Sequence, residues 1–101
     1  MSVDGARIEV QSNNGASVIA LIGEFDLASR DQLQQQFRAL QEANCRRVVL
    51  DLSQTRFLDS TMLGALVRAH LDGLDITIRG ASGIAQKALE VTGLASVFQG
   101  E

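Results

Sequence analysis

The chain has 101 residues, of which 46% are hydrophobic, and this is enough for one compact domain around one core. A formal net charge of −3, with scattered arginines and neither Tyr nor Trp, argues against nucleic acid or an anionic membrane as the partner. The lone Cys45 excludes an internal disulfide, and the sequence shows no signal peptide and no apolar run long enough to cross a bilayer. We therefore expect residues 1–101 to form a single domain of a soluble, cytoplasmic protein.

Two strands are expected near the start of the chain. Residues 7–11 alternate polar and apolar side chains, as a half-exposed strand does. Residues 18–22 are continuously apolar, which favours a strand covered on both faces. Asn14 and Gly15 between them are a strong signal for a tight reversal. The two strands should pair as a hairpin, with the first near a sheet edge.

The first helix is expected after this hairpin. Ser29 and Gln32 have the spacing of a capping box, in which Gln32 reaches back toward the Ser29 amide. Leu33, Phe37 and Leu40 then form one apolar stripe at helical spacing. The sequence therefore predicts a helix capped by Ser29.

The second half of the chain alternates strands with helices. The pattern predicts a strand at 48–52, a helix to about residue 71, a strand within 74–79 and a helix at 81–92. The last helix carries Ile84, Ala88 and Val91 on one side, and Gly93 is expected to end it. The order β-β-α-β-α-β-α predicts an α/β domain with a mixed, mostly parallel sheet, in which an antiparallel strand lies near one edge.

Residues 57–64 are the most informative stretch, because they place Asp59 beside two hydroxyl groups, those of Ser60 and Thr61, where a helix begins. Asp or Ser at a helix start is first of all an N-cap. The free backbone N–H groups and the helix dipole at such a start also suit a phosphate. Asp26 follows the second strand as Asp59 follows the third, so the two would share one surface if these strands are neighbours. Whether both acids only cap their loops stays open at this point.

Catalysis by this chain alone is not expected. Ser60 would need a base, but the only histidine, His70, lies ten residues along the same helix, about 15 Å away in axial rise. The sequence contains neither a glycine-rich phosphate loop nor a set of metal ligands. We therefore expect a binding module without a metal or cofactor.

Four segments, in order along nearly the whole chain, resemble the STAS family of anti-anti-sigma factors and related sulphate-transporter domains. Residues 21–26 are similar to the family's L-x-G-E-L-D, and 48–52 to its central strand. Residues 57–64 resemble its phosphorylation loop, usually D-S-S/T-G-L-G, and 89–98 its closing L-x-x-T-G-L followed by Phe.

The resemblance implies a phospho-switched binding module. Ser60 would be the phosphorylated residue, and it would form the partner-binding surface together with Asp26, Asp59, Thr61 and Met62. The implied partner is an anti-sigma factor that is also a serine kinase; its capture frees the sigma factor, phosphorylation breaks the complex, and a PP2C-type phosphatase restores it. ATP and magnesium would belong to the kinase. Met62 stands where the family usually has glycine, and we expect it to add apolar contact area at the interface.

One alternative remains within the same family. The chain would then be a STAS accessory subunit bound to the ATPase of a lipid-type ABC transporter, with the same loop contacting that partner. Detection of phosphate on Ser60 in cells would favour the switch, whereas co-purification with a transporter ATPase would favour the subunit.

Overall fold

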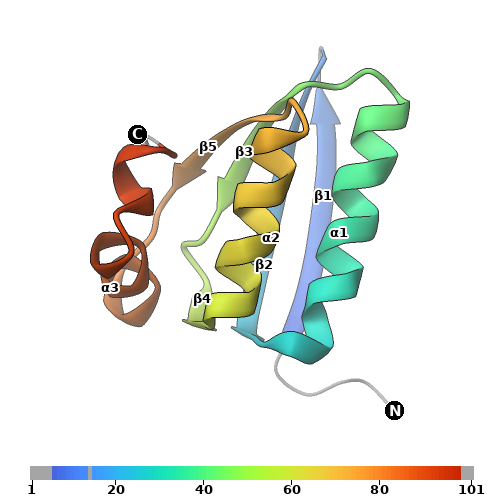
Figure 1. The fold of residues 1–101 in the computed structure, drawn as a ribbon. Helices are drawn as coiled ribbons and strands as arrows, with labels where there is room; N and C mark the ends of the chain where they lie inside the picture. Colours follow the sequence, from blue (N-terminus) through green and yellow to red (C-terminus); the bar gives the residue numbers. More distant parts are fainter. Residues whose placement is uncertain (1–5, 14, 99–101) are drawn as a thin grey trace.

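The computed structural model describes residues 6–13 and 15–98, which form a mixed sheet with helices against it (Figure 1). No helix in these described ranges is long and apolar enough to cross a membrane. The elements in chain order are β1 (Ala6–Asn13), β2 (Ala16–Phe25), α1 (Leu27–Glu42), β3 (Arg47–Asp51), β4 (Thr55–Leu58), α2 (Ser60–Leu71), β5 (Asp75–Arg79), α3 (Gly83–Val91) and the short 3-10 helix η1 (Leu94–Ser96).

The strand order confirms the predicted mixed sheet with an antiparallel strand at its edge. The pairing runs β1-β2-β3-β5, and only β1 is antiparallel to its neighbour. Asn13 lies opposite Ala16, and Gly15 is in a turn before Ala16; Asn14, the other residue of the predicted reversal, lies outside the described residues. Parallel pairing follows where helices connect the strands, because the crossover returns the chain to the same end of the sheet.

The sequence did not predict β4, which has only four residues. β3 pairs with the first half of β2, residues 16–20, and β4 pairs with residues 23–25, so the two short strands follow one another along the same side of β2. The Thr55 hydroxyl anchors the start of β4 by donating to the Leu21 carbonyl at 2.6 Å. The register shifts at Gly23, where the backbone φ of +105° suits glycine alone. These long-range contacts, and not a local pattern, make this segment a strand.

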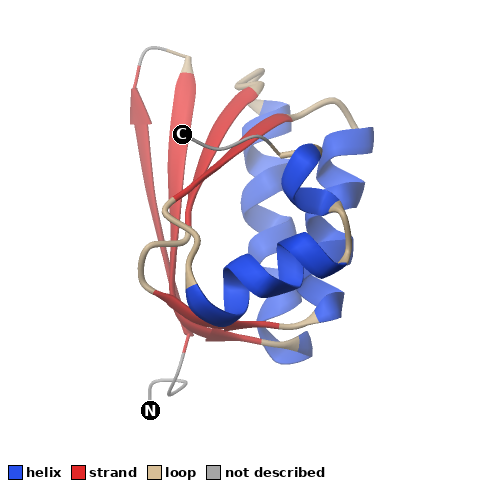
Figure 2. Cartoon of the chain, turned by 90° about the vertical axis from the view of Figure 1, so that its left-hand side faces the viewer, coloured by secondary structure: helices blue, strands red, loops and turns tan. Residues whose placement is uncertain are grey.

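The three α-helices all lie on one side of the sheet (Figure 2). Along β2, Ile19, Leu21 and Phe25 point into the core. Val18 and Ile22 point to the other face and are half-buried, and no helix of the described chain packs over them. The prediction that this strand is covered on both faces is therefore wrong. The domain has two layers, one of strands and one of helices. The run is continuously apolar because the sheet face without helices also carries apolar side chains, those of Val18 and Ile22.

The first helix begins earlier than predicted. Asp26 is its N-cap, and Ser29 is a buried residue of its first turn, so the proposed capping box is wrong. Asp26 directly follows the last residue of β2, and its carboxylate accepts the Ala28 amide at 3.0 Å, so the helix starts before Ser29. The predicted stripe is confirmed, because Leu33, Phe37 and Leu40 are all buried.

The last helix buries a different pair of apolar residues from those predicted. Ala85 and Leu89 are buried in the core, whereas Ile84 and Val91 are 59% and 74% exposed. Of the three residues that the sequence indicated, Ile84 and Val91 therefore face solvent, and only Ala88 is partly buried against the core. Gly93 follows the helix with a φ of +77°, as expected for a terminating glycine.

Candidate functional site

Two helices start close together at the end of the sheet where the parallel strands β2 and β4 finish. β2 and β4 are parallel neighbours, with Phe25 opposite Leu58. The Asp59 amide donates to the Phe25 carbonyl at 3.1 Å, which ties the two strand ends together. Asp26 directly follows β2, and Asp59 directly follows β4. α1 and α2 start from these two residues, side by side (Figure 1). β2 and β4 are therefore neighbours, which is the condition under which Asp26, Asp59 and Ser60 were expected to share one surface.

Asp59 fixes the start of α2 through one carboxylate oxygen. Its Oδ1 accepts the Thr61 amide and the Met62 amide, each at 3.1 Å, and the Thr61 hydroxyl at 2.6 Å. Asp59 is half-buried, so water competes weakly for these donors. Two of the free N–H groups of the first turn, those of Thr61 and Met62, are thus bonded by the Asp59 side chain, and the capping role is observed for Asp59 as it is for Asp26.

The two adjacent hydroxyls differ in their freedom. Ser60 is the first residue of α2 and is exposed, and its hydroxyl makes no hydrogen bond within the described residues. The Thr61 hydroxyl is half-buried and is used as a donor to Asp59. Of these two groups, the Ser60 hydroxyl is therefore the one that is accessible from solvent and not engaged by Asp59.

Met62 lies in the core and not at the surface. It is the third residue of α2, and its exposed fraction is 0%. The expectation that its thioether adds apolar contact area to an interface is therefore wrong. At this point in the helix the side chain points toward the sheet, where it fills space beneath the capped turn.

Asp51, at the end of β3, holds a loop. Its Oδ1 accepts the Ser53 amide at 2.9 Å, and its Oδ2 contacts an Arg79 guanidinium nitrogen at 3.3 Å. The Ser53 amide is the largest cause that lowers the pKa of the Asp51 carboxyl, and Arg79 adds to the effect. Asp51 thus serves the connection between β3 and β4, which brings β4 into register.

The comparison with known proteins identifies the family. The family model described as "Mlab, STAS domain" matches residues 8–99. The chain belongs to this STAS family. The STAS domain is 25% identical over 97 residues to an anti-sigma F factor antagonist of Paenibacillus polymyxa, covering 91% of this chain and 83% of that protein.

Solved structures agree with the fold of the STAS domain. An anti-sigma factor antagonist from Mycobacterium paratuberculosis matches with a TM-score of 0.85 at 24% identity, over 98% of this chain and 87% of that one. The unphosphorylated form of the anti-sigma factor antagonist SpoIIAA matches with a TM-score of 0.78 at 18% identity, over 94% of this chain and 88% of that one. The Bacillus SpoIIAA has also been solved in a phosphorylated form, which matches at 0.72 and 16% identity, over 94% of this chain and 91% of that one.

His70 of the STAS domain has a packing role. Its ring meets the buried ring of Phe98 edge-on, with centroids 5.7 Å apart and an interplanar angle of 86°. It belongs to the last turn of α2, and Ser60 to the first, so the two side chains lie at opposite ends of the helix. The described residues contain no group of three or more His, Cys, Asp or Glu side chains placed to hold a metal ion.

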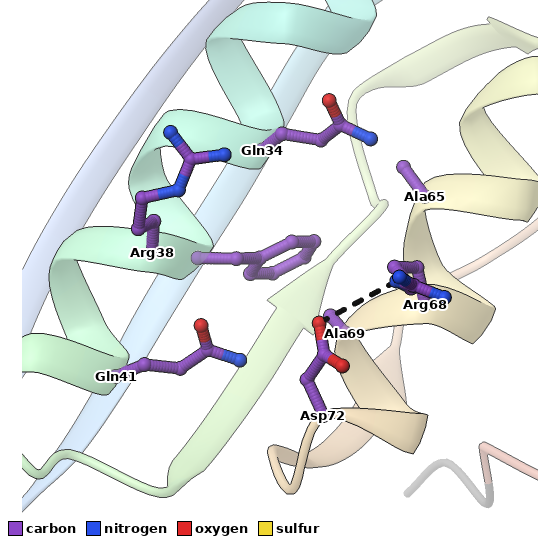
Figure 3. Close-up of a pocket in the computed structure, with 8 residues that line it drawn as sticks. Gln34, Arg38, Gln41, Ala65, Arg68, Ala69 and Asp72 are labelled. Carbon is purple, nitrogen blue, oxygen red and sulfur yellow. Dashed lines mark ion pairs between the residues drawn. The ribbon is translucent and has the colours of Figure 1, made fainter.

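A groove between α1 and α2 was not predicted from the sequence, because its two walls come from different helices (Figure 3). It has a volume of about 270 Å³, and the Arg68 and Asp72 ion pair, 3.7 Å apart, lies on one wall. It runs from Gln34 and Ala65, in the middle of α1 and α2, to Gln41 and Asp72, at the last turn of α1 and the C-cap of α2. Ser60 is not among the residues that line it. The residues that line it are Gln34, Phe37, Arg38, Gln41, Ala65, Arg68, Ala69 and Asp72.

Proposed function

We propose that this STAS domain is an anti-sigma factor antagonist that binds an anti-sigma factor serine kinase and is switched off by phosphorylation of Ser60. The observation that carries the proposal is the free, exposed Ser60 hydroxyl at the start of a helix whose cap is already occupied. The names of the Paenibacillus, Mycobacterium and SpoIIAA relatives support the same function. The domain acts in this proposal by binding and release, not by catalysis.

The capped helix start explains why a phosphate would alter the surface without altering the fold. The Thr61 and Met62 amides already donate to Asp59, so they are not available to a phosphate on Ser60, which would project into solvent. It would add about −1.5 to −2 charges to an edge that already carries the carboxylates of Asp26 and Asp59. The helix dipole tolerates that charge locally. A partner packed against the edge would not, because the charge would be buried without a counter-ion.

The size of the expected effect follows from the cost of that burial. An unpaired charge buried in an interface costs at least several kcal/mol. Each 1.4 kcal/mol corresponds to about a tenfold change in affinity. A single phosphate on Ser60 should therefore weaken the complex on the order of a thousandfold, and a PP2C-type phosphatase that removes it would restore binding.

The geometry favours Ser60 over Thr61 as the phosphate acceptor. Phosphorylation of Thr61 would break its 2.6 Å hydrogen bond to Asp59 and would place a dianion beside that carboxylate in a half-buried position. Ser60 has neither obstacle. Kinase, ATP and magnesium would approach it from solvent.

The test is an affinity pull-down from the native lysate with wild type, Ser60→Asp and Ser60→Ala. We expect wild type and Ser60→Ala to retain the same small serine kinase and Ser60→Asp to lose it, with all three proteins folded. Ser60→Ala is the matched control, because it removes the acceptor hydroxyl without adding charge. Equal recovery of the kinase by wild type and Ser60→Asp would contradict the proposal.

The same experiment separates the alternative function. An accessory subunit of a lipid-type ABC transporter would use a fixed, capped helix start as a constitutive contact. Recovery of a transporter ATPase by all three proteins would therefore favour that function over the phospho-switch.

A further inference from the structure

β1 leaves one edge of the sheet open. The strand order β1-β2-β3-β5 places it at the edge, and it pairs with β2 along all of its eight residues without a shift in register. Within the described chain, no backbone group bonds to its other side. Alternate residues of an edge strand direct their N–H and C=O groups away from the neighbouring strand, so β1 offers a row of free donors and acceptors to an added strand.

The two edges of the sheet differ in how they are protected against pairing. β5, at the far edge, has only five residues, and a short edge strand is one such protection. β1 is longer and regular, and it contains no proline. Its two charged residues, Arg7 and Glu9, have opposite signs, so they do not repel a second strand as a row of one sign would. β1 is therefore the edge that remains open to pairing.

The side chains of β1 are divided between two faces. Ile8 lies opposite Leu21 of β2 and packs against the core, so the even-numbered positions face the helices. Arg7 and Glu9 lie on the face without helices (Figure 2), where they form an ion pair at 3.1 Å. Their side chains are 68% and 55% exposed. Water screens such a pair, so either charge is available to a second partner.

A second copy of this chain matches the β1 edge, because the sequence around Ile8 is self-complementary. A two-fold axis through the sheet makes two β1 strands antiparallel and keeps their faces aligned, so one residue must lie opposite itself. With Ile8 at the axis, Arg7 lies opposite Glu9 of the second copy, and Glu9 lies opposite its Arg7. An axis at Arg7 or at Glu9 would place like charges opposite each other, which is destabilising. An axis at Val10 would give neither charge a counter-ion.

The same register also covers Val10. This side chain is 38% exposed although it lies on the face that carries the helices, so the helix layer leaves space at this edge. With Ile8 at the axis, Val10 lies opposite the small Ala6 of the second copy. The paired segments, Ala6 to Val10, span only about 17 Å of strand, which is short for a standard interface of about 800 Å² per partner. The association should therefore be weak and depend on concentration.

We propose that two copies of this STAS domain associate through β1, antiparallel and with Ile8 at the two-fold axis, and that their five-stranded sheets join into one. The β2 strands of the two copies then run in opposite directions, so the two Ser60 sites lie at opposite ends of the joined sheet. The proposal goes beyond the function proposed above and does not depend on it.

Charge reversal at Arg7 and Glu9 tests the proposal in sedimentation velocity from micromolar to millimolar concentration. Wild type should show a monomer–dimer equilibrium. Arg7→Glu and Glu9→Arg should each self-associate at least about tenfold more weakly, because like charges then face each other on both sides of the axis. Lys87→Glu is the matched control, since it makes the same charge change as Arg7→Glu at an exposed position of α3, beside β5 (Figure 1), and should associate as wild type does.

An equimolar mixture of Arg7→Glu and Glu9→Arg gives the decisive measurement. In the mixed dimer every acidic side chain at these positions faces a basic one. The mixture should therefore dimerise about as wild type does, although neither variant does so alone. The ion pair that both variants remove is exposed, so their melting temperatures should stay close to that of wild type, and thermal unfolding confirms that both are folded.

A wild type that stays monomeric over the whole concentration range would overturn the proposal. A dimer that both folded variants retain would place the contact on another surface, and a mixture that stays monomeric would rule out this register; either result also overturns it. Ser60→Asp should dimerise as wild type does, whatever its effect on kinase recovery, so a failure of the proposed function leaves this inference standing. Loss of the dimer in folded Ser60→Asp would place the contact at α2 and overturn the inference.

Discussion

The starts of α1 and α2 occupy equivalent places in the sheet but distribute their side chains in opposite ways. Each follows a parallel strand and is capped by an aspartate, Asp26 or Asp59. The first residue of α1, Leu27, is apolar and 57% exposed, whereas α2 has the exposed Ser60 there. At the third residue, α1 buries the small polar Ser29, and α2 buries Met62.

The difference shows that the start of α2 is held by more contacts than the start of α1. The Asp59 carboxylate receives three donors, and the buried thioether of Met62 holds the same turn from below. The Asp26 carboxylate receives one, and the turn above it exposes a leucine. The backbone at the start of α2 is therefore held more firmly than that at the start of α1, and under the function proposed above this turn would present Ser60 to the kinase.

Replacement of the third residue should give the largest contrast between the two starts. We expect Met62→Ala to lower the free energy of unfolding by roughly 2–5 kcal/mol, because it leaves a cavity in the core. Ser29→Ala should change it by less than about 1 kcal/mol, since little volume is lost. Urea denaturation of both variants measures this, and similar losses would mean that Met62 does not support its turn in the way the packing indicates.

Removal of the caps should give a smaller contrast. Asp59→Ala should cost about 1–2 kcal/mol of unfolding free energy and Asp26→Ala about 0.5–1, because the first leaves more donors without an acceptor. Asp59→Asn is the control, since asparagine is a good N-cap and should retain most of the stability. If Asp26→Ala proved the more damaging of the two, the assignment of α2 as the more firmly held start would not stand.

Asp51 extends the comparison to a strand-end acid that holds a loop instead of a helix. Its pKa is lowered in the folded protein, chiefly by the Ser53 amide, so its ionised form stabilises the fold. That contribution is complete above the unfolded pKa of about 4 and is lost as pH falls through the lower folded pKa. We expect Asp51→Asn to cost about 1 kcal/mol at pH 7, with a smaller difference from wild type below about pH 4. Urea midpoints at several pH values check this, and a difference that grows on acidification would refute it.

The features that could be predicted from sequence are those with a local cause. Apolar spacing located the stripe of Leu33, Phe37 and Leu40, and Asn14 with Gly15 located the hairpin reversal. Asp59 was recognised as a possible cap because a helix pattern follows it at once. The capping box at Ser29 failed for a local reason as well, since Asp26 caps the same turn earlier and a short motif does not reveal which of two caps is used.

Other features depend on contacts between distant segments. Four residues of β4 have no pattern strong enough to specify a strand, and the Thr55 hydroxyl bond to Leu21 depends on β2 being alongside. The burial of Met62 and the exposure of Ile84 depend on which side of each helix meets the sheet. A helical pattern identifies an apolar side, but a helix with apolar residues on two sides, such as α3, can present either one.

The sequence by itself determined the order of the main elements, the hairpin, the α/β class and the residues 57–64 as the candidate site, because caps, turns and hydrophobic periodicity act between near neighbours in the chain. Only the tertiary structure decided that β4 pairs with the C-terminal end of β2, and this pairing brings Asp26 and Asp59 together. It also decided that Met62 is internal and that Gly64 faces open space. These outcomes depend on strand pairing and helix packing, which minimise exposed apolar area and unpaired backbone groups over the whole domain and not within any single segment.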